Sequence, residues 1–379
     1  MRPCVHRATR STLHATDRST RSGCRNLHVP PLWVRGLPRP LVACSAGGAP
    51  LYDRLANSGG TSGWLRGVIA PMFTPFLPDG TLDLEGAAAL VDYLAGCGYV
   101  DGVFVRSGLG QMYTFTADEV LALARVAVNA ANGRVPILVG AAGVWDRNDQ
   151  HRPDPRKYVQ ESIDLAAKVV HMGAAAAVLP VPLALPPADM RQYYAAVAAG
   201  AKVPIVAYQP PGVPPEYRLS PIDVAHLAAT FAIHGLKLST DSEELFAPIA
   251  NAVRDLPFSL IAGNEAYYLR ALELGAVGVI GQGCNLYPEV LQAVRRLWLC
   301  GDREGAVRAQ AAVWDALRAT DGLDVAVLGK QIFAARGVKL QPYSRGGATP
   351  YSQEVVSRAA AAIDRCAAPY RAAEPSTRQ

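Results

Sequence analysis

Two side chains suited to carbonyl chemistry stand near the ends of consecutive apolar segments. Lys237 lies within residues 233–239, and Tyr208 closes residues 203–208. A lysine buried in an apolar strand is costly unless its amine is paired, neutral or reacting, and burial lowers the pKa of the amine. A neutral amine can attack the ketone of a small 2-oxo acid to form a Schiff base, and a neighbouring tyrosine can carry protons. The local pattern also fits an ordinary lysine that reaches solvent at a strand end, so the surrounding elements must decide.

Short apolar runs alternate with amphipathic stretches of helical length around these two residues. The expected strands are residues 68–73, 102–106, 136–142, 175–181, 204–208, 235–239, 259–263 and 278–281. The expected helices between them include residues 84–95, 116–131, 157–171, 188–199, 221–231, 242–254 and 266–274. Thr116 and Glu119 carry the signature of a capping box at a helix start, and Gly98 and Gly133 are placed to end helices.

Eight strands that alternate with helices predict an α/β fold, a (β/α)8 TIM barrel over residues 64–300. Residues 301–379 are expected to add a C-terminal α-helical appendage, with helices at 302–320, 326–336 and 353–365. An open doubly wound sheet is the alternative, but no glycine-rich phosphate loop follows the first expected strand.

The barrel prediction brings the two chemical side chains together. Catalytic groups of such barrels come from the C-terminal ends of the strands, and adjacent strands lie roughly 4.8 Å apart. Tyr208 and Lys237 end neighbouring strands, so we expect both to reach one small ligand.

Composition and charge exclude several other classes of protein. Half of the 379 residues are hydrophobic, yet no apolar run reaches the roughly 18 residues of a membrane-spanning helix. The excess of 37 Lys and Arg over 32 Asp and Glu comes from residues 1–50, which hold eight Arg and a single acid, Asp17. The remainder is slightly acidic, so neither nucleic acid nor membrane is an expected partner. The seven Cys form no metal-binding spacing, and neither a metal nor another cofactor is expected.

Residues 1–60 are rich in Arg, Ser, Thr, Pro and Gly without apolar periodicity, which predicts a disordered extension. One explanation is an upstream start codon that is not the native one, which leaves a cytoplasmic protein. The alternative is an organellar transit peptide of about 45 residues that is cleaved near residues 41–46.

The order of motifs resembles the dihydrodipicolinate synthase / N-acetylneuraminate lyase family of class I aldolases. The matching segments are residues 67–76 (GVIAPMFTPF), Tyr208-Gln209-Pro210-Pro211-Gly212, Gly235-Leu236-Lys237, residues 259–265 (SLIAGNE) and residues 275–280 (GAVGVI). The resemblance covers residues 64–345. It implies a cofactor-independent enzyme that forms homo-oligomers and takes a small-molecule 2-oxo acid, usually pyruvate, as its partner.

The resemblance also implies roles for individual residues. Lys237 would form the imine and Tyr208 would relay protons as the general acid/base. Gly263 and Ile280 would contact pyruvate through the backbone. The substrate carboxylate would be held by the backbone amides of Ser107, Gly108 and Leu109, because amide donors need no particular side chain.

Three departures from the family pattern narrow the expected substrate. Ser107-Gly108-Leu109-Gly110-Gln111 replaces the family's Gly-Thr-Thr-Gly-Glu, so the threonine hydroxyl of the proton relay is missing. Residues 182–185 (PLAL) replace a Tyr-Tyr pair, and Val213 replaces an Arg that many synthase members carry. The loss of that Arg argues against an amino-acid semialdehyde partner, so the favoured reaction is lyase or aldolase chemistry on pyruvate or a hydroxylated, deoxy-sugar-acid-like 2-oxo acid.

Further polar residues are candidates for the active face. Arg106 could clamp a substrate carboxylate or pair with an acid on a neighbouring helix. The loop at residues 145–155 is expected to overhang the site. The other polar candidates for this face are Gln111, Asn264, Glu265, Gln282 and Asn285.

Two alternative functions stay open at this point. One is a condensation of the dihydrodipicolinate synthase kind. The other is a catalytically impaired family member that binds 2-oxo acids without turnover, since relay hydroxyls are missing.

Overall fold

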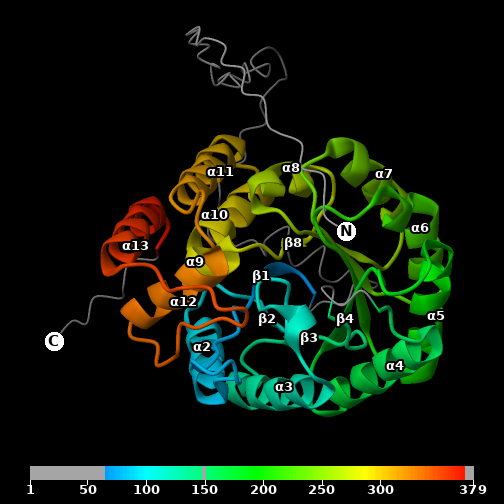
Figure 1. Cartoon of the computed structure of the whole chain (residues 1–379). Coiled ribbons are helices and arrows are strands. Elements are labelled where there is room, and N and C mark those ends of the chain that lie inside the picture. Colours follow the sequence, from blue (N-terminus) through cyan, green and yellow to red (C-terminus); the bar gives the residue numbers. More distant parts are fainter. Residues whose placement is uncertain (1–64, 147–150, 372–379) are drawn as a thin grey trace, which may run out of the picture. The chain divides into compact units, whose positions relative to one another are not determined.

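The computed structural model describes residues 65–146 and 151–371, and in them eight parallel strands close into a barrel. The strands follow one another around the barrel in chain order (Figure 1). They are β1 Gly67–Pro71, β2 Gly102–Val105, β3 Ile137–Gly140, β4 Ala176–Pro180, β5 Ile205–Gln209, β6 Gly235–Leu238, β7 Ser259–Ala262 and β8 Gly278–Val279. The (β/α)8 prediction is confirmed, and each expected strand is found, one to three residues shorter in most cases.

The strands are apolar along their whole length because both of their faces are covered. Every strand residue is buried, as expected for parallel strands packed between a filled interior and a layer of helices. The interior is packed by side chains that include Ile69, Phe104, Val206 and Ile261. Tyr208 belongs to this interior cluster, so its strand carries a polar group into an apolar core.

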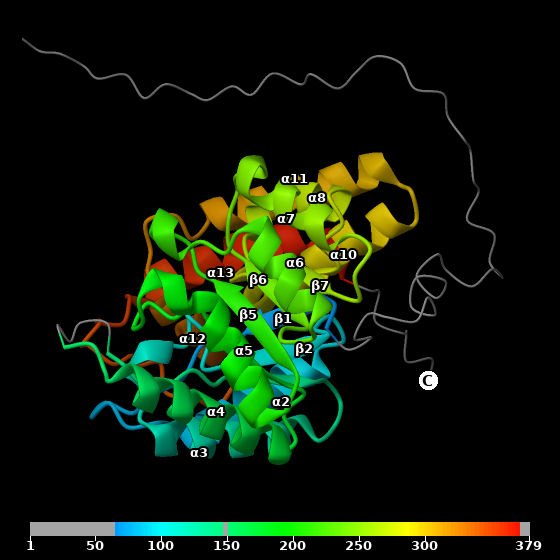
Figure 2. The same ribbon diagram turned by 90° about the vertical axis from the view of Figure 1, so that its right-hand side faces the viewer.

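A ring of helices covers the outside of the barrel (Figures 1 and 2). They are α2 Leu84–Gly96, α3 Ala117–Ala131, α4 Pro155–His171, α5 Met190–Ala201, α6 Pro221–Ala229, α7 Glu243–Val253, α8 Tyr268–Glu273 and α10 Pro288–Leu299, with the short α9 Gly283–Leu286 before the last. The predicted capping box is present, because Thr116 accepts a hydrogen bond from the backbone of Glu119 and the Glu119 side chain accepts one from the backbone of Thr116. α8 begins later than expected because residues Glu265–Tyr267 form a 3-10 turn.

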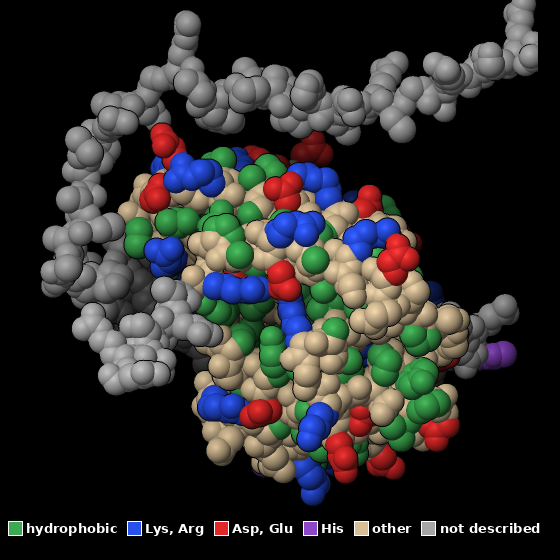
Figure 3. Space-filling model, turned by 90° about the vertical axis from the view of Figure 1, so that its left-hand side faces the viewer, with side chains coloured by type: hydrophobic (Ala, Val, Ile, Leu, Met, Phe, Trp, Pro, Cys, Tyr) green, Lys and Arg blue, Asp and Glu red, His purple; other side chains and the backbone are tan. Residues whose placement is uncertain are grey.

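Three further helices form the predicted C-terminal appendage: α11 Arg303–Arg318, α12 Val325–Ala335 and α13 Gln353–Ala367. α11 packs on α10, and α13 packs on both α11 and α12. On the face shown in Figure 3, basic and acidic side chains are interspersed. None of the helices in the described ranges is long and apolar enough to cross a membrane.

The extension at residues 1–60 lies outside the described residues, as does the middle of the loop at 145–155.

Candidate active site

Lys237 and Tyr208 are direct neighbours across two strands. Their Cα atoms are register partners on β6 and β5, so the pleat turns both side chains to the same side of the sheet. The Nζ of Lys237 lies 4.3 Å from the centroid of the Tyr208 ring and 5.7 Å from the centroid of Phe104. Each of the two residues is 5% exposed. The structure therefore brings the two predicted residues into one buried site.

The Lys237 amine is more readily deprotonated in this site than it would be in water. Burial lowers the pKa of Lys237 from 10.5 to about 8, and the nearby Cys284 and Glu265 oppose this shift. An amine with this pKa is deprotonated in a useful fraction of molecules near neutral pH, which is the form that attacks carbonyl carbon.

A cavity of about 420 Å³ opens at the C-terminal ends of the strands, and Lys237 and Tyr208 line it. Four more of the predicted residues line the same cavity: Gly108, Leu109, Gly263 and Ile280. The volume suits a small organic acid.

The loop after β2 contributes Gly108 and Leu109 to the lining of this cavity. Within the described chain, the N–H groups of Gly108 and Leu109 have no hydrogen-bond acceptor, whereas the next two amides bond back into the loop. Ser107 is buried and not among the cavity-lining residues; its hydroxyl donates to the Met72 carbonyl and accepts from the Gly110 amide. Ser107 thus shapes the loop, and the two free amides can receive a carboxylate.

The hydroxyl of Tyr208 lies next to the same loop. A Cβ atom placed on Gly108 would lie 3.3 Å from the Tyr208 hydroxyl oxygen. A side-chain hydroxyl at position 108 would therefore lie within reach of Tyr208, and glycine provides none.

Glu265 is a buried acid at the centre of the site, for which the sequence predicted only a place on the active face. It is 4% exposed, accepts a hydrogen bond from the Gly283 amide at 2.9 Å and lies 3.4 Å from the Tyr287 hydroxyl. Burial raises the pKa of Glu265, and the Gly283 amide and Lys237 oppose that effect. A Cβ on Gly281 would lie 2.0 Å from the carboxylate, so a larger residue at position 281 would displace the Glu265 side chain. In the sequence, the feature that could have indicated this role is the position of Glu265, an acid that closely follows an apolar strand.

Arg106 does not line the cavity, in contrast to its predicted role as a carboxylate clamp. The residue has a φ of 50°, in the left-handed region, and is 3% exposed. Its guanidinium donates to the carbonyls of Met112, Gly140 and Ala142 at 2.8–3.1 Å. Burial lowers the pKa of Arg106 to about 10. Arg106 therefore ties the loop after β2 to the end of β3.

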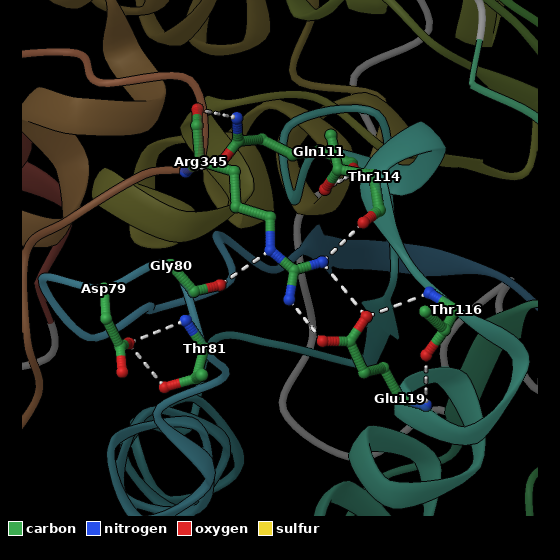
Figure 4. Close-up of polar contacts among 8 residues, drawn as sticks. All are labelled: Asp79, Gly80, Thr81, Gln111, Thr114, Thr116, Glu119 and Arg345. Atoms are coloured by element: carbon green, nitrogen blue, oxygen red, sulfur yellow. Dashed lines mark hydrogen bonds and ion pairs between the residues drawn. The ribbon is translucent and has the colours of Figure 1, made fainter.

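Gln111 is turned away from the cavity toward the C-terminal segment, where it meets Arg345 (Figure 4). The Gln111 amide group donates to the Arg345 carbonyl at 2.8 Å and accepts from the Arg345 amide at 3.0 Å. The Arg345 guanidinium in turn bonds Gly80, Thr114 and the Glu119 carboxylate. We call this set of contacts the Arg345 clamp. It holds the loop that carries the free amides.

Lys330 also holds the C-terminal segment that carries Arg345. It is 1% exposed, and its amine donates to Thr74, Tyr343 and Ser344. Burial lowers the pKa of Lys330 to about 8. Lys330 resembles Lys237 in burial and pKa, but it does not line the cavity.

The remaining polar candidates divide between the cavity and the scaffold. Gln282 lines the cavity, and Asn264 lines a neighbouring one. Asn285 donates to the Pro71 carbonyl at 3.0 Å.

Cys284 is fully buried, and burial raises the pKa of its thiol, which makes it a poor nucleophile. Among the residues that the structure describes, no three His, Cys, Asp or Glu side chains gather in a way that could hold a metal ion.

A second cavity of about 450 Å³ adjoins the first, and both are lined by Pro210, Pro211, Ser239, Gly263 and Glu265. The residues that line only the second cavity are more polar and include Arg218, Thr240, Asp241 and Ser242. We call the cavity that Lys237 and Tyr208 line the inner cavity, and the neighbouring cavity that Arg218 lines the outer cavity.

A buried, readily deprotonated lysine at the mouth of a (β/α)8 barrel, with a tyrosine beside it, defines an enzyme class that forms Schiff bases. The sequence profile of the Dihydrodipicolinate synthetase family matches residues 64–365, and the chain belongs to this family. Members of the family are class I, aldolase-type lyases, and this chain is a lyase.

Individual relatives carry different names. The chain is 30% identical over 246 residues to the putative 2-dehydro-3-deoxy-D-gluconate aldolase YagE of Escherichia coli strain K12, which covers 64% of this chain and 76% of the relative. It is 29% identical to a 4-hydroxy-tetrahydrodipicolinate synthase of Methylococcus capsulatus, over 64% of this chain and 78% of the relative.

Solved structures are similar in fold over almost their whole length. The E. coli YagE structure in complex with pyruvate has a TM-score of 0.66 and 25% identity, covering 79% of this chain and 98% of that one. An N-acetylneuraminate lyase of Mycoplasma synoviae has a TM-score of 0.68 and 20% identity, covering 80% and 98%.

Proposed function

We propose that the chain cleaves a hydroxylated 2-oxo acid of the deoxy-sugar-acid type into pyruvate and an aldehyde. The observation that carries this proposal is the buried Lys237 amine beside Tyr208, in a cavity that also presents two free amides. The name of the YagE relative, a putative aldolase of a 2-dehydro-3-deoxy sugar acid, supports the same substrate class.

Binding places the ketone beside the amine. The substrate carboxylate accepts hydrogen bonds from the amides of Gly108 and Leu109, and Gly263 and Ile280 wall the inner cavity. This orientation leaves the hydroxylated end of the substrate toward the polar outer cavity. Orientation of this kind removes much of the entropic cost of the reaction.

Lys237 then forms the covalent intermediate. The neutral amine attacks the ketone carbon, the resulting carbinolamine loses water, and a protonated imine remains. The positive nitrogen can accept an electron pair from the bond that breaks. This electron sink replaces the oxyanion or metal that an unassisted cleavage would require.

Tyr208 moves the protons of the cleavage step. It takes the proton of the substrate hydroxyl, directly or through water, while the adjacent carbon–carbon bond breaks and its electron pair flows toward the imine. The products are an aldehyde and an enamine. Protonation of the enamine carbon and hydrolysis of the imine release pyruvate and regenerate the amine.

Val213 supports cleavage over a condensation of the dihydrodipicolinate synthase kind. It is 5% exposed and apolar, so the side chain at position 213 carries no charge, and a condensation of that kind would need another residue to bind the semialdehyde carboxylate. Because Gly108 carries no hydroxyl, we propose that a water molecule in the cavity takes the place of the threonine hydroxyl in the proton path.

We also propose that the chain acts as a homo-oligomer, as the resemblance implies, and sedimentation velocity tests this directly. The function itself is tested with a panel of 2-oxo-3-deoxy sugar acids by measuring pyruvate release. Turnover of at least one such acid, lost in Lys237→Ala, is the expected result. Imine formation without any turnover would mean that the chain binds 2-oxo acids and does not cleave them.

A further inference from the structure

The outer cavity contains a single cationic side chain, Arg218, among the residues that line it. Arg218 is exposed, and its Nε donates to the Val213 carbonyl at 3.4 Å. Val213 is the position at which the sequence lacks the family's arginine. Arg218 therefore brings a guanidinium to the backbone of that position from five residues further along the chain.

The outer ends of this guanidinium are available to a ligand. In the described part of the chain, neither Nη atom of Arg218 takes part in a hydrogen bond or ion pair. An arginine that is fixed through Nε and free at its Nη atoms can bind a carboxylate or phosphate by two parallel hydrogen bonds.

The loop that carries Arg218 is held on both sides. The Tyr217 hydroxyl donates to the Leu185 carbonyl at 2.6 Å, and the Leu219 amide donates to the buried Gln209 side chain at 2.9 Å. Prolines at 214 and 215 stiffen the same segment. Arg218 is thus an exposed side chain on a fixed backbone, and fixing the backbone lowers the entropic cost of binding a ligand.

We propose that Arg218 recognises a terminal anionic group on the substrate, at the end remote from the imine. This inference rests on the proposed function, because it assumes that the 2-oxo end occupies the inner cavity. The substrate class is then a hydroxylated 2-oxo acid that ends in a second carboxylate or in a phosphate ester. Thr240 and Asp241, which line the same cavity, face the hydroxyl groups between the two ends.

The test compares three 2-oxo-3-deoxy acids of equal carbon number that end in a hydroxymethyl group, a carboxylate or a phosphorylated hydroxymethyl group. The wild-type protein is expected to give its highest kcat/KM with one of the two anionic substrates, and which of them it is identifies the anion. Arg218→Gln is expected to lower kcat/KM for that substrate by roughly 10- to 100-fold, the range for a hydrogen bond to a charged group. It is expected to change kcat/KM for the hydroxymethyl substrate by less than about threefold.

Two further variants separate recognition from folding. Arg191→Gln removes an exposed arginine that pairs with Asp223 outside both cavities, and it is expected to behave like wild type with all three substrates. Arg218→Lys retains the charge without the two-pronged geometry, and it is expected to recover part of the loss. Equal losses of Arg218→Gln on all three substrates, or a wild-type preference for the hydroxymethyl substrate, would overturn the inference.

Reductive trapping of pyruvate on the wild-type protein reports the proposed function separately. An adduct without any preference for an anionic end would overturn this inference alone. Failure to trap pyruvate or any of the three acids would overturn both.

Discussion

The amine of Lys237 lies over the face of Tyr208, 4.3 Å from the ring centroid, because the two residues are paired across β6 and β5. The ring face attracts the charged form of the amine, and burial opposes it. Burial is the larger effect, so the pKa of Lys237 falls to about 8. The same pairing that builds the barrel therefore prepares the nucleophile.

Tyr208→Phe separates the ring of Tyr208 from its hydroxyl. The ring packs edge-on against Phe104 with 6.5 Å between centroids, and phenylalanine preserves that contact. We expect kcat for cleavage to fall by roughly 10²- to 10⁴-fold, the usual range for loss of a general acid/base. Pyruvate should still be trapped on the variant by borohydride. A variant that cleaves substrate at the wild-type rate would show that another group moves the proton.

The pH dependence of imine formation follows from the lowered pKa of Lys237. Only the neutral amine attacks, so the rate of imine formation should rise with pH and level off above about 8. Stopped-flow measurement of imine formation with pyruvate over pH 6–10 would show this, and a midpoint near 10.5 would contradict it.

The lowered pKa of Lys237 also makes the free energy of unfolding depend on pH. The folded-state pKa of about 8 lies below the ordinary lysine pKa of 10.5, so the unfolded chain binds more protons between these two pH values. The free energy of unfolding should therefore rise with pH from about 8 to 10.5, through Lys237 and also through Lys330, whose pKa is lowered to about 8. Urea unfolding of wild type and Lys237→Met across this range should show a smaller slope in the variant.

Much of this arrangement could be predicted from the sequence. Buried parallel strands are continuous apolar runs, so all eight could be found, and strand order fixed the neighbours of Lys237. The Arg345 clamp could not be predicted from the sequence, because Gln111 and Arg345 are 234 residues apart and their contact depends on how the C-terminal segment packs. The contacts of Arg106 could not be predicted either. Its backbone has a positive φ and its side chain donates to three carbonyls, and no local sequence pattern indicates that φ.

Glu265→Gln tests the electrostatic part of the site. The Glu265 carboxylate favours the charged form of Lys237, so its replacement by a neutral amide should lower the pKa of Lys237 further. The midpoint of the rate of imine formation should move to lower pH, while glutamine can still accept the hydrogen bond from Gly283. An unchanged or higher midpoint would mean that Glu265 has no electrostatic effect on the amine.

Arg345→Met tests whether the C-terminal segment supports substrate binding. Loss of the hydrogen bonds to Glu119, Thr114 and Gly80 should lower the free energy of unfolding by about 2 kcal/mol, measured by urea unfolding. Because the clamp holds the loop with the free amides, KM should rise more than kcat falls. Arg134→Met, which removes an exposed ion pair with Asp92, is the matched control and should change neither kinetic constant.

The most direct test of the account is borohydride reduction in the presence of pyruvate, followed by intact mass and peptide mapping. Lys330 serves as an internal comparison, since burial also lowers its pKa to about 8 but it lies outside the cavity. One stable adduct is expected, on Lys237, and it should be absent from Lys237→Ala. An adduct on Lys330 instead, or no adduct with pyruvate and larger 2-oxo acids, would contradict it.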